Sequence, residues 1–75
     1  MPHIQIKLLE GKTEEQKQLL AAEVIKAAQS VIGLGDESYS VSIEDFTRTE
    51  WKDDVYPKQI MGKKDILYKE PGYVM

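Results

Sequence analysis

The spacing of apolar residues changes twice along this chain, and these changes limit the folds that it can adopt. Ile4, Ile6 and Leu8 alternate with polar residues, which predicts an extended strand with one apolar face. Apolar residues then recur at helical spacing between positions 20 and 31, and alternation returns over positions 38–44. The order strand, helix, strand predicts a βαβ unit with parallel strands and a right-handed crossover.

Local signals mark both ends of the expected helix. Thr13 is placed as its N-cap, and Gln16 follows at the spacing of a capping box. Gly33 or Gly35 is expected to end the helix through a left-handed cap. The apolar stripe between these ends is expected to face the core and consists of Leu20, Val24, Ala27, Ala28 and Val31.

The second strand is expected to run from Ser38 to Glu44, with Tyr39 and Ile43 on its apolar face. Two strands are too few to be stable alone in water. A chain of 75 residues without cysteine also has only a small core and no disulfide framework. A second copy would complete a four-stranded sheet with helices on one face. The chain is therefore expected to be a homo-oligomer.

The C-terminal part is expected to form short helical turns. Thr49 is placed as the cap of a helix that carries Trp51, and Pro57 is expected to end or kink it. Gly62 is expected to interrupt the helical structure a second time, and another helical turn is expected over residues 65–68. Residues 1–75 are predicted to form a single α+β domain.

Composition argues against several classes of function. The net charge of −3 and the isoelectric point near 5.0 disfavour nucleic-acid binding, which needs a concentrated positive field. One histidine and no cysteine leave no His or Cys cluster for a metal, so no metal site is expected. No apolar run reaches membrane-spanning length and no signal peptide is visible, so a soluble, cytoplasmic protein is expected.

The start of the chain carries the strongest chemical signal. Removal of Met1 would turn the ring nitrogen of Pro2 into a free secondary amine. A terminal amine has a reference pKa of about 7.7–8.0, and apolar surroundings lower that pKa by disfavouring the charged form. Pro2 is therefore a candidate general base near neutral pH. The alternative is that Pro2 is simply a tolerated first residue of a strand.

The segment from Pro2 to Lys17 carries the pattern proline, apolar alternation, Leu-Glu-Gly, cation and Thr-Glu-Glu-Gln-Lys. It resembles the amino terminus of the 4-oxalocrotonate tautomerase family, in which Met is removed and the exposed proline is the general base. Further similarity reaches Pro71-Gly72-Tyr73. The resemblance implies a tautomerase without a cofactor, of the longer subgroup similar to phenylpyruvate tautomerases.

The resemblance also implies substrate-binding positions. Lys12 stands where the family usually carries an arginine for a substrate carboxylate, and an ammonium lacks that bidentate fork. A strand rises about 3.3 Å per residue, which separates Lys12 from Pro2 by roughly 25–30 Å. Lys12 would therefore serve the Pro2 of a neighbouring copy. Ser40 stands where well-known members carry a second arginine, so a monocarboxylate is favoured over a dicarboxylate.

Three further residues are weighed with these. Arg48, expected in a loop, would supply the charge that Ser40 lacks, or it is an exposed loop arginine. Trp51 corresponds to an aromatic wall of the family's pocket, and it also suits a hydrophobic anchor. His3, beside Pro2, is expected to be a solvent-exposed residue at the strand edge rather than a substrate contact.

The predicted function is keto–enol or dienol tautomerisation of a 2-oxo acid, with Pro2 as base and acid. Two alternatives stay open. One is hydration or hydrolytic dehalogenation by the same amine, with Glu44 or Asp45 activating water. The other is a binding protein that has kept the scaffold without catalysis. A dimer is favoured over a hexamer, because the segment 51–75 would cap the surface through which shorter relatives assemble.

Overall fold

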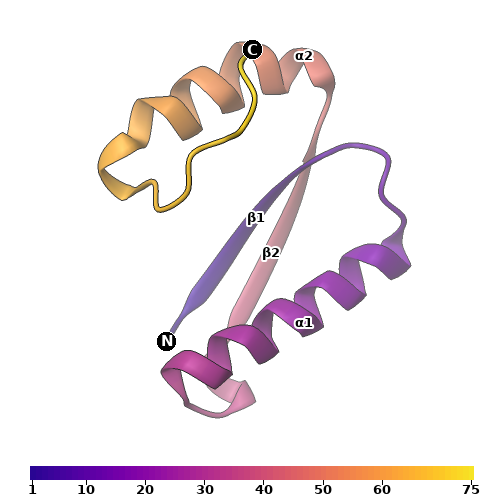
Figure 1. Ribbon diagram of the computed structural model, residues 1–75. Helices are drawn as coiled ribbons and strands as arrows, with labels where there is room; N and C mark the ends of the chain where they lie inside the picture. The colour runs from indigo at the N-terminus through magenta and orange to yellow at the C-terminus, as the bar shows by residue number, and fades with distance from the viewer. The chain divides into compact units, whose positions relative to one another are not determined.

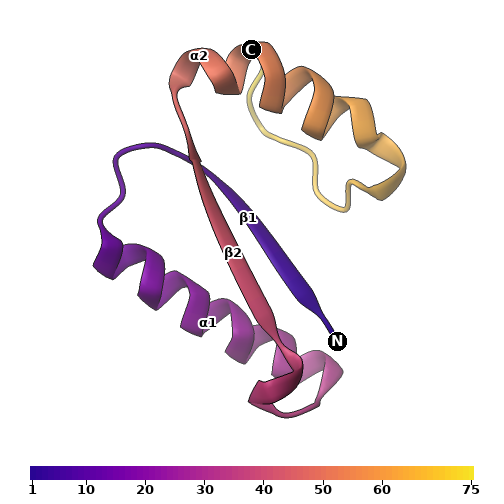
Figure 2. The same cartoon turned by 180° about the vertical axis from the view of Figure 1, so that it is seen from behind.

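Strand β1 (His3–Leu9), helix α1 (Glu14–Ile32) and strand β2 (Ser40–Phe46) follow one another in the computed structural model, which describes residues 1–75. The two strands pair side by side in a parallel, two-stranded sheet, and α1 runs along it (Figures 1 and 2). This arrangement confirms the predicted βαβ unit. The chain divides into two compact units, 1–45 and 46–75, which are described separately.

The predicted start of α1 is confirmed. The backbone N–H of Thr13 donates to Gln16 Oε1 at 2.8 Å, and the N–H of Gln16 donates to Thr13 Oγ1 at 3.1 Å. This reciprocal capping box pairs two backbone donors that the helix itself leaves unpaired. At the other end Gly33 is the C-cap, with φ 88° and ψ −147°. The positive φ requires glycine, but ψ lies outside the left-handed helical region that was predicted.

The half-buried face of α1 differs in part from the predicted stripe. Leu20, Val24 and Ala28 are half-buried as predicted, whereas Ala27 is exposed and Val31 is 85% exposed. No residue of α1 is fully buried. The helix therefore leaves apolar surface uncovered within one chain.

The second strand begins two residues later than predicted. Residues Asp36–Ser38 form a short 3₁₀ helix, η1, and β2 begins at Ser40. The carboxylate of Asp36 accepts a hydrogen bond of 2.7 Å from Gln29 Nε2, which ties this turn to the last part of α1. Tyr39 is 8% exposed, and its hydroxyl donates to the carbonyl of Gly33 at 2.6 Å.

The second unit is a run of irregular helices: α2 (Arg48–Glu50), the π-helix η2 (Trp51–Ile60) and the 3₁₀ helix η3 (Met61–Ile66). The N-cap of α2 is Thr47, so the prediction that Thr49 caps this helix was wrong. Thr47 Oγ1 accepts from the N–H of Glu50 at 3.1 Å, and Glu50 Oε1 accepts from the N–H of Thr47 at 2.7 Å. Glutamate three residues after the cap completes a second capping box, which a cap at Thr49 would lack.

Pro57 lies inside η2 and does not end it. A proline ring clashes with the carbonyl four residues earlier in an α-helix. In this segment the bonds reach five residues back, as shown by the N–H of Met61 donating to the carbonyl of Tyr56. The turn predicted over residues 65–68 was misplaced, because η3 runs from Met61 to Ile66 and overlaps that range only at its end. The predicted interruption at Gly62 was wrong, since Gly62 lies inside η3. The tail then returns along these helices (Figures 1 and 2).

Very little of the chain is buried. The fully buried apolar residues are Tyr39 in the first unit and Val55 in the second, and Val55 is completely inaccessible. No helix has the length and apolar character needed to cross a membrane. Large apolar side chains with more than half of their surface exposed are Met1, Leu19, Val31, Ile32, Leu34, Ile66, Tyr68 and Val74.

Candidate active site

The N-terminal end of the sheet brings Pro2 beside Ser40. The carbonyl of Pro2 accepts a hydrogen bond of 3.3 Å from the backbone N–H of Ser40, just before β1 begins. Pro2 is half-buried and Met1 is fully exposed. Pro2, which precedes β1, and Ser40, the first residue of β2, thus lie at the edge of the sheet where a free prolyl amine would stand. Of the predicted site residues, these two are the pair that the sheet joins.

His3 contributes a contact that the sequence reasoning missed. Its Nδ1 lies 2.7 Å from Ser40 Oγ, and its Nε2 lies 3.2 Å from Ser42 Oγ. All three side chains are exposed. Alternation places Ser40 and Ser42 on one strand face, but only the register of the two strands brings His3 opposite them. The signal was present as a histidine on the polar face of one strand and serines on the polar face of the other.

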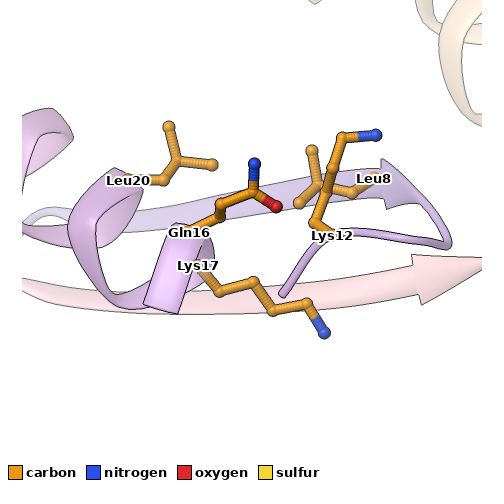
Figure 3. A pocket seen from close by; sticks show the side chains of 5 residues that line it. All are labelled: Leu8, Lys12, Gln16, Lys17 and Leu20. Atoms are coloured by element: carbon orange, nitrogen blue, oxygen red, sulfur yellow. The ribbon is translucent and has the colours of Figure 1, made fainter. Parts of the chain in front are cut away.

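Lys12 lies at the rim of a cavity of about 220 Å³, beyond the opposite end of β1 (Figure 3). Leu8 and Leu20 supply its apolar part, and Figure 3 shows the side chains of Lys12 and Lys17 diverging. The complete lining is Leu8, Lys12, Gln16, Lys17 and Leu20. An exposed ammonium beside two leucines suits a ligand with a carboxylate and an apolar body.

Lys17 is already paired, because its ammonium donates to the Asp45 carboxylate at the end of β2. The hydrogen bond to Asp45 raises the pKa of Lys17 above its ordinary value of 10.5, with the charge of Asp45 acting in the same direction. On the same strand Glu44 lies 3.8 Å from the ammonium of Lys7. Both carboxylates considered for water activation therefore face lysines.

Lys12 and Pro2 flank opposite ends of one strand, so a single chain does not bring them into one pocket. The cavity at Lys12 contains neither Pro2 nor Ser40. Each chain thus presents two separate candidate half-sites, one at Pro2 and one at Lys12. Completion of the site by a second copy stays a prediction.

Arg48 and Trp51 belong to the second unit. Arg48 is exposed and is the first residue of α2, so its predicted place in a loop was wrong. Trp51 is half-buried, packs edge-on against Phe46 with ring centroids 6.2 Å apart, and donates from Nε1 to the Tyr73 hydroxyl at 3.1 Å. The Tyr73 ring also lies 5.6 Å from that of Tyr56. The tail therefore holds the indole, which sequence reasoning did not anticipate.

Comparison with known proteins agrees with this architecture. Residues 2–53 match the tautomerase family, whose members are described as tautomerase enzymes. A probable tautomerase from Xylella fastidiosa is 37% identical over 73 residues, covering 97% of this chain and 89% of the relative. Tautomerase PptA from Pectobacterium carotovorum is 35% identical over 74 residues, covering 97% of both chains.

Other relatives match about two thirds of the chain. The 2-hydroxymuconate tautomerase of Bacillus subtilis is 35% identical over 51 residues, covering 68% of this chain and 82% of the relative. The crystal structure of YwhB, a homologue of 4-oxalocrotonate tautomerase, superposes with a TM-score of 0.60 at 36% identity, covering 63% of this chain and 77% of that one. The chain therefore belongs to the tautomerase family, within the 4-oxalocrotonate tautomerase group, and is an isomerase.

Proposed function

We propose that the protein tautomerises the enol or dienol of a 2-oxo acid, with the Pro2 amine as base and then acid after Met1 is removed. The amine would take a proton from the enol and return it to a carbon, so the reaction needs no external oxidant or reductant. A positioned acid–base group contributes about 10²–10⁴-fold to such a transfer.

The observation that carries this proposal is the anchoring of Pro2. Its carbonyl is bonded to the N–H of Ser40, which fixes the residue while leaving the ring nitrogen uninvolved in that bond. Met1 is fully exposed, so a processing peptidase can reach it. Fixed placement of the reacting group is the main requirement for efficient proton transfer.

The polar groups at the two half-sites favour a substrate with one carboxylate. Ser40 offers a neutral hydroxyl beside Pro2, and Lys12 offers one ammonium at the apolar cavity. A second carboxylate would need another cation to offset its desolvation. Arg48, in the second unit, is proposed as a further contact for that same carboxylate, and Trp51 is the proposed apolar wall.

We further propose that the working protein is a homo-oligomer, with the dimer favoured. A core of two buried residues is small for 75 residues, and α1 has no buried residue. Burial of the exposed Leu19, Val31 and Ile32 between copies would supply apolar stabilisation at roughly 25 cal/mol per Å². Assembly would also place Lys12 of one copy near Pro2 of another.

The Pro2 proposal is tested by comparing processed protein with protein that retains Met1, with both masses confirmed. The processed form should be at least about 100-fold more active towards a phenylpyruvate enol, because an amide nitrogen is not basic. A dienol dicarboxylate measured alongside should give the lower kcat/KM. Equal activity of the two forms would show that the amine is not the base.

The hydratase alternative receives no support from the carboxylates that it would use. Asp45 is bonded to Lys17, and Glu44 lies 3.8 Å from Lys7. Each of these carboxylates thus already faces a lysine ammonium group.

A further inference from the structure

His3, the single histidine of the chain, is held between two hydroxyls. Its Nδ1 faces Ser40 Oγ at 2.7 Å and its Nε2 faces Ser42 Oγ at 3.2 Å. Ser40 also donates its backbone N–H to the carbonyl of Pro2. The imidazole therefore shares a partner with the residue that carries the proposed base.

Ser40, His3 and Ser42 form a row of hydrogen-bonding side chains. The number of hydrogens in this row restricts which hydrogen bonds Ser40 can make to a ligand. A neutral imidazole has one donor and one acceptor nitrogen, and each serine hydroxyl has a single hydrogen. When Nδ1 of His3 is the acceptor, Ser40 donates its only hydrogen to the ring and has none for a ligand. When Nδ1 carries the hydrogen, it donates to Ser40 Oγ, and the Ser40 hydrogen is free.

Ser42 allows the second state to form without a change in charge. The proton moves from Nε2 to Nδ1 of His3 through solvent, and the Ser42 hydroxyl then turns to donate to Nε2. Each ring nitrogen keeps one hydrogen bond in both states, at the observed distances. The two states differ in whether Ser40 offers a donor or an acceptor to solvent and ligand.

We propose that His3 is a positioning residue that sets the hydrogen-bond polarity of Ser40, and that an anionic substrate oxygen selects the Nδ1–H state. A carboxylate or enolate oxygen accepts hydrogen bonds only, so it can bind Ser40 only in this state. The inference rests on the proposed function, because it takes Ser40 as a substrate contact. It adds that the Ser40 donor is made available by His3.

The charged groups around this row come from both strands. Lys7 on β1 and Glu44 on β2 share the row's face by alternation, and they oppose each other at 3.8 Å. The terminal amine of processed Pro2 is a further ionisable neighbour. Helix α1 lies on the other face, since Leu8 and Leu20 line one cavity and Ile43 lines another with Ala21. It therefore directs no charge at His3.

The test is nitrogen NMR of the ring of His3, which needs no assignment because the chain has one histidine. Benzoate serves as the probe, since it carries a carboxylate and cannot enolise. Saturation with benzoate should shift the ring signals towards the Nδ1–H form in the processed protein, and Ser40→Ala should abolish that shift. Unchanged ring signals, an equal shift in Ser40→Ala, or failure of benzoate to bind would each overturn the inference.

Kinetics supply the second readout. Ser42→Ala should raise KM for a monocarboxylate enol by about fivefold with less than a twofold change in kcat, since Nε2 of His3 then loses its donor in the Nδ1–H state. Gln5→Ala is the matched control, because Gln5 is exposed on the same strand face. A fall in kcat with unchanged KM in Ser42→Ala would contradict a positioning role.

The NMR result and the processing experiment fail independently. If the ring of His3 responds to benzoate while Met1 retention leaves activity unchanged, the Pro2 mechanism fails and the His3 inference stands. If Met1 retention abolishes activity while the ring does not respond, the His3 inference alone fails.

Discussion

The units 1–45 and 46–75 both begin a helix with the same device and then diverge. Thr13 and Thr47 each form a capping box with the residue three positions later. The first box starts a regular α-helix of 19 residues, whereas the second starts a helix that becomes π-helical from Trp51 and contains Pro57. A cap therefore fixes where a helix begins but not how it continues.

The difference lies in what holds each segment. In the first unit, the alternating and helical spacings of apolar residues agree with the observed strands and helix. Local conformational preference and tertiary packing therefore favour the same structure. In the second unit, the hydrogen bond from Trp51 to Tyr73 and the ring contact between Tyr56 and Tyr73 hold the returning tail, and Val55 is fully buried. The match to the tautomerase family spans residues 2–53, which include nearly all of the first unit and only the start of the second.

The largest expected effect concerns which unit supplies the cation for the substrate. Lys12→Ala should raise KM by about 10- to 100-fold, because a hydrogen bond to a charged group is lost. Arg48→Ala should have a smaller effect on KM, and Lys69→Ala, in the exposed tail, is the charge-matched control. A larger effect at Arg48 than at Lys12 would move the carboxylate contact to the second unit.

Next in size is the contrast between a buried and an exposed valine. Val55→Ala should lower the free energy of unfolding by about 2 kcal/mol, through lost apolar burial and a residual cavity. Val31, on α1, is 85% exposed in one chain. Val31→Ala should change the free energy of unfolding little if Val31 is exposed in solution. If a second copy of the chain covers Val31, the substitution should lower stability, and the loss should be larger at the lower protein concentration. Urea unfolding at two protein concentrations measures both, and a negligible loss for Val55→Ala would contradict its burial.

The two capping boxes allow a matched comparison. Thr13→Ala and Thr47→Ala should each lower the free energy of unfolding by about 1 kcal/mol, since each leaves a backbone N–H without its side-chain partner. Thr49→Ala is the control and should change it by less than about 0.5 kcal/mol. If Thr49→Ala proved the more destabilising of the two substitutions in the second unit, the cap would be misplaced.

The smallest expected effect is the pH dependence of the Lys17–Asp45 pair. The folded pKa of Lys17 lies above 10.5, so the stabilisation is complete below pH 10.5 and is lost as the pH rises through the folded pKa. Thermal unfolding should therefore show a steeper alkaline loss of stability in the unmodified protein than in Asp45→Asn. Parallel pH profiles would mean that the pair contributes nothing measurable, as is common for exposed pairs.

Much of the first unit was predictable because its signals are local. The capping box at Thr13, the alternation of Ile4, Ile6 and Leu8, and the stop at Gly33 each depend on neighbours in sequence. The Thr47 cap was also available, since Glu50 stands at the capping-box position and Thr49 lacks such a partner. That error came from the choice between two threonines.

By itself the sequence determined the βαβ order, the resemblance to tautomerases and the candidate base Pro2, because periodicity and the order of residues carry this information. Only the tertiary structure decided that His3 meets Ser40 and Ser42, and that Tyr73 holds Trp51. These contacts join residues 22 to 39 positions apart. Contacts at such separations depend on strand register and on the path of the tail, and no local preference encodes either.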